Sequence, residues 1–203
     1  MLCGGKSTRM GVPKATLPFG SETMLQRVVR LLSTVVSPIV VVAARDQELP
    51  ILPPEVIVTR DERDAKGPLE GIRAGLSALP SSIDAGYITS CDVPLLMPAF
   101  VERMIALIGD HDVVVMEIGG FAHPLSAIYR RSTLPQAESL LAADRLRPVF
   151  LFDAVRTRRV TPHDMRDVDP ELRTLRNLNT PEDYRAALAD AGIPPPSPPA
   201  DRG

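Results

Sequence analysis

Residues 39–44 read IVVVAA and follow directly after Pro38. An apolar run this short, introduced by a proline, is typical of a strand that is buried on both faces of a parallel sheet. Residues 56–59, 86–90 and 112–116 are further candidate strands. Between the runs, apolar residues recur every three or four positions, which predicts amphipathic helices. These helices are expected near residues 24–36, 69–79 and 98–108.

The second half of the chain departs from this alternation. Gly119 and Gly120 form a turn signal between residues 113–116 and 125–129, so an antiparallel hairpin or a longer excursion is expected there. The chain as a whole predicts an α/β fold with a mostly parallel sheet and helices on both faces. Two more helices are expected over residues 134–143 and 181–191, the second with Thr180 as its cap and Pro181 in its first position.

The composition is that of an ordinary globular protein. With 44% hydrophobic and 24% charged residues, the 203 residues can bury one substantial core, and a single domain is expected over residues 1–191. Five prolines within residues 194–199 indicate a disordered tail over residues 192–203. No apolar run reaches the roughly 18 residues that cross a bilayer. A cytoplasmic protein without a membrane partner is therefore expected.

Charge and cysteine content argue against two further classes, nucleic-acid-binding proteins and proteins built on disulfides or a zinc site. A net charge of −2 argues against a nucleic-acid partner, because affinity for phosphate backbones comes mainly from clustered lysines and arginines. Cys3 and Cys91 are too few and too far apart for a disulfide framework or a four-cysteine zinc site. Both are expected to be reduced thiols.

Residues 2–17, which read LCGGKSTRMGVPKATL, have the composition of a polyphosphate-binding loop. Gly4 and Gly5 allow backbone N–H groups to approach phosphate oxygens, and Arg9 and Lys14 supply positive charge. A flexible terminus with solvated charges explains the same residues equally well. The glycines do not fit the dinucleotide pattern GxGxxG, and only the last three positions of the P-loop pattern are present.

Asp92, in the sequence SCDVP at residues 90–94, is the strongest separate signal. It follows a predicted buried strand, and parallel sheets bind ligands at the carboxyl ends of their strands. Because Mg²⁺ prefers one or two carboxylates completed by phosphate oxygens, Asp92 is a candidate metal ligand. The alternative is a carboxylate that caps the helix beginning near residue 98. No basic residue adjoins Asp92 in the sequence, so it is expected to be unpaired and partly hydrated.

These motifs resemble those of the molybdenum cofactor guanylyltransferases, the MobA-like nucleotidyltransferases. Residues 61–72 resemble the family's D…GPLAGI element, with the charged Glu70 in place of alanine, and Asp92 matches the aspartate of its DxP motif. Residues 177–183, NLNTPED, resemble its NxNTPEE motif. The family's loop pattern GGxSxRMGxxK is matched at Gly4, Gly5, Ser7, Arg9, Met10, Gly11 and Lys14.

The resemblance implies a three-layer Rossmann-like α/β fold. It also implies an enzyme that transfers GMP from GTP to molybdopterin, releases pyrophosphate and uses Mg²⁺. Arg9, Lys14 and Asp92 are the implied catalytic residues, with Asp92 holding the metal. The implied nucleotide contacts are Leu2, Cys3, Gly4, Gly5, Lys14, Asp61, Gly67, Pro68, Leu69 and Asp92. The candidate acceptor contacts are His123, Arg145, Arg147, Asn177 and Asn179, and the candidate protein partners are molybdoenzymes or chaperones.

Several of these assignments have plain structural alternatives. Gly67 and Pro68 also suit an ordinary turn before a helix. His123 also suits a structural hydrogen-bonding role, and Arg145 and Arg147 also suit an exposed helix. In the family a full first strand precedes the glycines, whereas only three residues do so here. A strand this short is expected to leave the centre of the sheet without hydrogen-bonding partners.

Two other functions remain open on the sequence alone. A related cytidylyltransferase or sugar-phosphate nucleotidyltransferase would use the same loop and the same aspartate, because both serve any nucleoside triphosphate. A nucleotide-binding regulatory protein without turnover belongs to a different class. The presence of Arg9, Lys14 and Asp92 argues against it.

Overall fold

The computed structural model describes residues 1–4, 13–61 and 67–195. Its strands are β1 (Pro18–Phe19), β2 (Glu22–Thr23), β3 (Val40–Ala44), β4 (Ile57–Asp61), β5 (Ala85–Thr89), β6 (Val113–Ile118), β7 (Phe121–Arg130) and β8 (Thr157–Val160). Its α-helices are α1 (Met24–Ser33), α2 (Gly67–Ala78), α3 (Pro98–Ala106), α4 (Leu134–Ala142), α5 (Val149–Phe152), α6 (Pro162–Met165) and α7 (Pro181–Asp190). Single 3₁₀ turns are η1 (Lys14–Thr16), η2 (Arg131–Thr133) and η3 (Arg173–Leu175).

Leu2 joins the two main groups of strands. β3 pairs in parallel with β4, and a four-stranded group has the order β5-β7-β6-β8. Leu2 makes parallel bridges to Val42 of β3 on one side and to Ser90, just beyond β5, on the other. The backbone N–H of Leu2 donates to the carbonyl of Thr89 at 2.8 Å, and that of Cys3 donates to the carbonyl of Val42 at 2.8 Å. The expected loss of hydrogen bonds at the short first strand therefore does not occur.

The resulting sheet is mixed rather than wholly parallel. β7 runs antiparallel to both β5 and β6, and β6 runs parallel to β8. The predicted hairpin is confirmed, since Gly119 and Gly120 connect β6 to β7 with φ values of 56° and 82°. Because β7 is antiparallel to both of its neighbours, β6 runs in the same direction as β5. The carboxyl ends of β3, β4, β5 and β6 consequently lie at one edge of the sheet.

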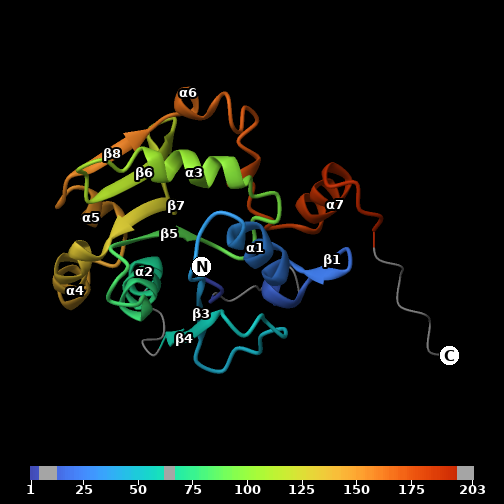
Figure 1. The fold of residues 1–203 in the computed structure, drawn as a ribbon, viewed down its shortest axis with the longest axis horizontal. Helices are drawn as coiled ribbons and strands as arrows, with labels where there is room; N and C mark the ends of the chain where they lie inside the picture. The colour runs from blue at the N-terminus through green and yellow to red at the C-terminus, as the bar shows by residue number, and fades with distance from the viewer. Residues whose placement is uncertain (5–12, 62–66, 196–203) are drawn as a thin grey trace.

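Helices cover both faces of the sheet, as the alternating pattern predicted (Figure 1). On β3, Val42 packs in the cluster that contains α2 and α4, whereas Val41 packs in the cluster that contains α1. On β6, Val115 faces the α2 side and Val114 packs with α3. β3 and β6 carry apolar side chains on both faces, and helices pack against each face, so both strands are buried on both sides. No helix among the described residues is long and apolar enough to cross a membrane.

Helix α2 packs closely against Leu2 at Gly71. A Cβ at this position would lie 3.0 Å from Cδ1 of Leu2, which the sheet holds on both sides. Overpacking a core costs about 1–3 kcal/mol, and the helix propensity of alanine offsets about 1 kcal/mol of this. We therefore expect Gly71→Ala to lower the free energy of unfolding by about 1 kcal/mol, as measured by urea denaturation.

The matched control is Ser77→Ala, at an exposed position of the same helix. This substitution is expected to change stability by less than about 0.5 kcal/mol. If Gly71→Ala proves as stable as the wild type, α2 can move away from Leu2 and the contact is not limiting.

Candidate functional site

A cluster of polar side chains surrounds Asp92, three residues beyond the end of β5. Its Oδ2 accepts a hydrogen bond from Nζ of Lys14 at 2.7 Å, and its Oδ1 accepts one from Nδ2 of Asn177 at 3.0 Å. The hydroxyl of Ser90 donates to the same Oδ1. Lys14 also donates to Oδ1 of Asn179 at 2.9 Å. These five residues are called the Asp92 cluster below.

The structure corrects the expectation that Asp92 is unpaired. Its partner Lys14 lies 78 residues earlier in the chain, so no neighbour in the sequence indicated the pair. The side chain of Lys14 is 19% exposed and that of Asp92 is 12% exposed. The pair therefore lies at the boundary with solvent, where another cation or an anion can reach it. The alternative role as a helix cap is wrong, because the N-cap of α3 is Met97, whose side chain makes no capping hydrogen bond and whose backbone N–H donates to Oγ1 of Thr174 at 3.0 Å.

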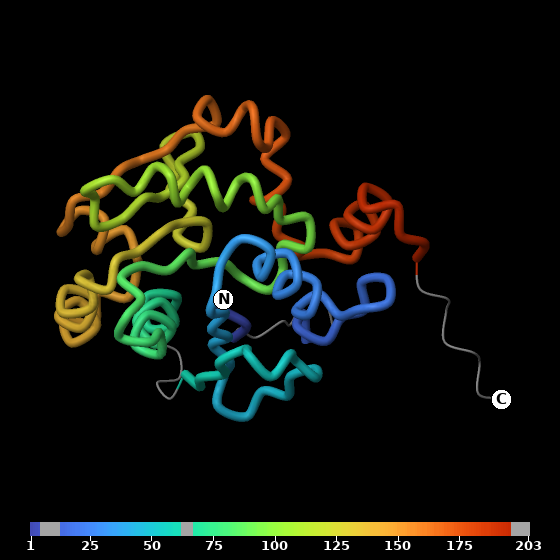
Figure 2. Tube along the Cα trace, in the orientation of Figure 1, coloured from blue at the N-terminus to red at the C-terminus, as the bar shows by residue number. Residues whose placement is uncertain are grey.

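The chain before α7 passes beside the loop after β5 (Figure 2). This brings Asn177 to Asp92 and Asn179 to Lys14. The backbone N–H of Leu178 donates to the carbonyl of Asp92 at 3.0 Å. Thr180 caps α7, as predicted, and the structure adds a capping box with Asp183. The carboxylate of Asp183 also accepts from the backbone N–H of Asn179, and these hydrogen bonds lower the pKa of Asp183. The start of the helix thus fixes Asn179.

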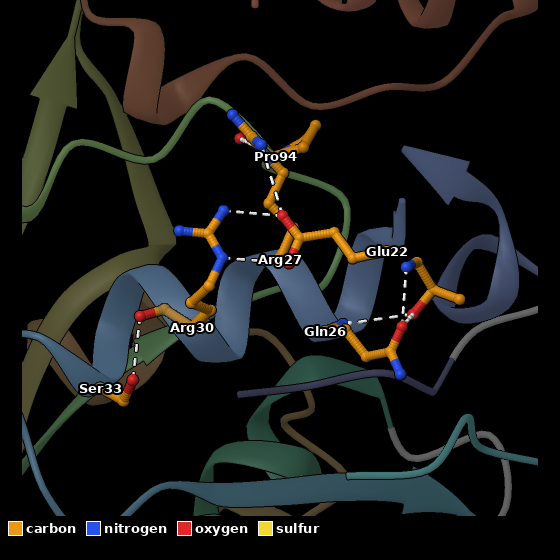
Figure 3. Close-up of polar contacts among 7 residues, drawn as sticks. Glu22, Gln26, Arg27, Arg30, Ser33 and Pro94 are labelled. Atoms are coloured by element: carbon orange, nitrogen blue, oxygen red, sulfur yellow. Dashed lines mark hydrogen bonds and ion pairs between the residues drawn. The ribbon is translucent and has the colours of Figure 1, made fainter. Parts of the chain in front are cut away.

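Arg27 of α1 holds the loop that follows Asp92 at Pro94 (Figure 3). Its Nε donates to the carbonyl oxygen of Pro94 at 2.7 Å, and its guanidinium lies 4.8 Å from the ring centroid of Phe19. Glu22 forms ion pairs with both Arg27 and Arg30, at 3.4 and 2.7 Å. The main chain two residues beyond Asp92 is therefore anchored to α1. Sequence patterns gave no indication of this contact.

Residues 2–4 lie at the same edge of the sheet, between β3 and the chain that follows β5. Gln47 closes this edge: its Nε2 donates to the carbonyl of Cys3 at 3.0 Å, and its Oε1 accepts from the N–H of Ala44 at 3.1 Å. Gln47 was not predicted, and its only signal is its place three residues beyond a parallel strand. Gly5 and Arg9, both predicted site residues, lie outside the described residues.

Both cysteines are free and buried. A hydrogen bond with Cys3, followed by burial, raises the pKa of the Cys91 thiol above its ordinary value. A protonated thiol is a weak nucleophile. The pair therefore contributes to the packing beneath the site.

The residues predicted for the base side of the nucleotide lie at the ends of two neighbouring elements. Asp61 is the last residue of β4, and Gly67 opens α2 with a φ of 68°. A Cβ at Gly67 would lie 3.5 Å from the carbonyl oxygen of Leu146. The segment that carries Arg145 and Arg147 therefore touches the start of α2.

The first turn of α2 presents different side chains to solvent and to the core. Pro68 is exposed, whereas Leu69 is fully buried and packs in the core beneath the sheet edge. Glu70 is also fully buried and pairs with Arg73 at 2.6 Å, which raises the pKa of Arg73. The charge of Glu70 is thus balanced within the helix.

Three predicted acceptor residues lie apart from the Asp92 cluster. His123 is on β7, opposite Met116, and burial lowers the pKa of its imidazole, which is therefore neutral at pH 7. The guanidinium of Arg145 lies 4.0 Å from the ring centroid of Phe150. Within the described residues, no hydrogen bond connects His123, Arg145 or Arg147 to the cluster.

The donor set of the cluster fits a hard cation that brings phosphate oxygens with it. One carboxylate and the amide oxygen of Asn179 are oxygen donors of the kind that Mg²⁺ and Mn²⁺ prefer. The ammonium of Lys14 already places a positive charge beside Asp92, where a metal cation would otherwise lie. Among the described residues, no group of three or more His, Cys, Asp or Glu side chains forms a metal cage. The ammonium of Lys14 gives the cluster a cation that can bind an anionic substrate.

Similarity to known proteins extends over nearly the whole chain. A family model described as the MobA-like NTP transferase domain matches residues 1–158. A protein of Carboxydothermus hydrogenoformans, named probable molybdenum cofactor guanylyltransferase, is 34% identical over 189 residues, which cover 93% of each chain.

Solved structures share the fold. Molybdopterin-guanine dinucleotide biosynthesis protein A from Archaeoglobus fulgidus gives a TM-score of 0.76 at 18% identity, over 94% of this chain and 96% of its own. A Mycobacterium tuberculosis protein solved in complex with manganese gives a TM-score of 0.59 at 16% identity, over 93% and 96% of the two chains.

Proposed function

The chain belongs to the MobA-like NTP transferase family, and from this premise we propose that it transfers GMP from GTP to molybdopterin and releases pyrophosphate. The observation that carries the proposal is the Asp92 cluster, where a lysine and a carboxylate meet at the carboxyl ends of the strands. The relative at 34% identity, named for this activity, supports guanine as the base and molybdopterin as the acceptor.

The reaction needs no nucleophile from the protein. The terminal phosphate of the acceptor attacks the α-phosphorus of GTP in line, so the protein contributes positioning and charge neutralisation. The parallel part of the sheet serves as a Rossmann-like platform, on which the main chain around Gly4 and Gly5 holds the phosphates. Leu2 and Cys3, whose N–H groups donate within the sheet, lie beside the nucleotide. Asp61 and the first turn of α2, which comprises Gly67, Pro68 and Leu69, lie on the base side.

Lys14 and Asp92 change partners when the nucleotide binds. Asp92 would hold Mg²⁺, which would supply charge neutralisation at the triphosphate. Lys14, released from the carboxylate, neutralises the charge that develops on the leaving pyrophosphate, with Arg9 as a second cation. The acceptor contacts are His123, Arg145, Arg147, Asn177 and Asn179.

Pyrophosphate release tests this function directly. The assay presents GTP, CTP and ATP in turn, each alone, with molybdopterin and with a sugar phosphate. Release is expected only with GTP and molybdopterin together. A preference for CTP would identify a cytidylyltransferase, and release only with a sugar phosphate as acceptor would identify the other related enzyme. Absence of release with every pair would leave a nucleotide-binding protein.

Nucleotide selectivity is also expected in thermal unfolding. At equal concentration, a ligand that binds the folded protein more tightly stabilises it more, so GTP with Mg²⁺ should raise the melting temperature more than CTP or ATP does. At a concentration about 100 times its Kd, a ligand adds roughly 2.7 kcal/mol to the free energy of unfolding. Differential scanning fluorimetry measures the shifts. Equal shifts from all three nucleotides would remove the case for guanine.

The remaining assignments concern context rather than chemistry. We propose that residues 1–191 form the catalytic domain, with residues 192–203 as a tail, most of which lies outside the described residues. We also propose that the protein acts in the cytoplasm and delivers the product to molybdoenzymes or their chaperones. The composition and the family support these assignments.

A further inference from the structure

The two oxygens of the Asp92 carboxylate have different partners. Oδ1 accepts from two neutral donors, the hydroxyl of Ser90 and the amide of Asn177. Oδ2 meets only the cation of Lys14 among the described residues. A carboxylate held in this way has one oxygen committed to the protein and the other available to a positive charge.

The neutral donors differ in how firmly the fold holds them. Asn177 lies in the irregular segment between η3 and α7, whereas Ser90 follows directly after β5 and bridges to Leu2. The N–H of the next residue, Cys91, donates to the carbonyl of Leu2 at 3.1 Å, which fixes the backbone on that side. Ser90 is only 8% exposed. Of the two donors, the hydroxyl of Ser90 is therefore the one whose position the sheet fixes.

We infer that Ser90 is a positioning residue, whose hydroxyl holds Oδ1 of Asp92 so that Oδ2 faces the metal ion of the metal–nucleotide complex. The hydrogen bond from the Ser90 hydroxyl to Oδ1 of Asp92, in the turn that follows β5, places the hydroxyl beside the carboxylate. The inference rests on the proposed function, because it presumes that a metal ion arrives with the nucleotide. Groups that orient a metal ligand in this way commonly contribute about 10–100-fold to metal affinity.

Manganese binding tests the inference without relying on turnover. The full chain is titrated with Mn²⁺ in the presence of a GTP analogue that cannot be cleaved at the α-phosphorus, and free Mn²⁺ is measured by electron paramagnetic resonance. Ser90→Ala is expected to weaken Mn²⁺ binding by about 10–100-fold. Ser90→Thr, which restores a hydroxyl, is expected to recover most of the affinity. Binding of the analogue without metal should be unchanged in both variants.

Ser126→Ala is the matched control. Ser126 is a buried serine on the neighbouring strand β7, and its hydroxyl donates to the carbonyl of Leu125 at 2.9 Å. Its loss should leave Mn²⁺ affinity unchanged. If Ser90→Ala does not fold, Ser90→Cys keeps a small buried side chain with only a weak donor, and the same loss of Mn²⁺ affinity is expected.

The outcomes separate the inference from the function on which it rests. Wild-type Mn²⁺ affinity in a folded Ser90→Ala or Ser90→Cys variant would overturn the positioning role and leave the proposed function standing. Equal losses in Ser90→Ala and Ser126→Ala would show a general effect of removing buried hydroxyls, and would also overturn it. A wild-type protein that binds no Mn²⁺ with the analogue would overturn both.

Discussion

Asp92→Asn is expected to lower turnover by about 10³-fold, the upper end of the cost of losing one charge-stabilising group. Asparagine keeps the size of the side chain and an oxygen that accepts a hydrogen bond from Ser90 or Asn177. It removes the negative charge that a hard cation requires. Turnover measured against Mg²⁺ concentration, in both proteins, checks the expectation.

A second buried aspartate provides the control for this substitution. Asp169 is 1% exposed, and its two oxygens accept from the backbone N–H groups of Arg173 and Thr174, at 2.8 and 2.9 Å. Asp169→Asn removes one acceptor and is expected to cost about 1 kcal/mol of stability while turnover is retained. Near-wild-type turnover of Asp92→Asn, with unchanged Mg²⁺ dependence, would mean that the metal is held elsewhere.

Lys14→Ala is expected to lower turnover by about 10²-fold, because one cation that neutralises the leaving pyrophosphate is lost. Stability should change by less than about 1 kcal/mol, since the ion pair with Asp92 is partly exposed. Freed from its ammonium partner, the carboxylate should also bind Mn²⁺ more tightly in the absence of nucleotide. Steady-state kinetics and a Mn²⁺ titration measure the two effects.

Arg185→Ala is the matched loss of a positive charge. Arg185 is an exposed residue of α7 that pairs with Glu182 and lies outside the Asp92 cluster. Its removal is expected to leave turnover unchanged. Should Lys14→Ala turn over like Arg185→Ala, the assignment of Lys14 to the leaving group would have to be withdrawn.

The parts of the fold that were predictable are those in which local pattern and burial agree. The apolar run 39–44 became β3, and the glycine pair at 119–120 became the β6–β7 turn. β8 was missed because Thr157–Val160 reads TRRV, and two arginines hide a strand that is buried at only one of its residues. The four-residue helices α5 and α6 are too short for periodicity to reveal them.

The same distinction applies to the site. Lys14, Asp92, Asn177 and Asn179 were each identified from motifs, but no rule of local sequence predicts that the lysine pairs with the aspartate. Such contacts depend on how the loops return to the sheet edge. Ser90 was not predicted to take part, because a serine next to a strand carries no signal of its own.

The distances along the chain within the Asp92 cluster have a consequence for folding. Its members are up to 165 residues apart, and two of them precede α7 by only a few positions. Closing loops of this length costs entropy that only completed tertiary contacts can offset. The cluster is therefore complete only when the chain before the final helix is docked on the loop after β5. A chain whose final segment has come loose keeps Lys14, Ser90 and Asp92 but loses the hydrogen bonds that Asn177 and Asn179 make with them.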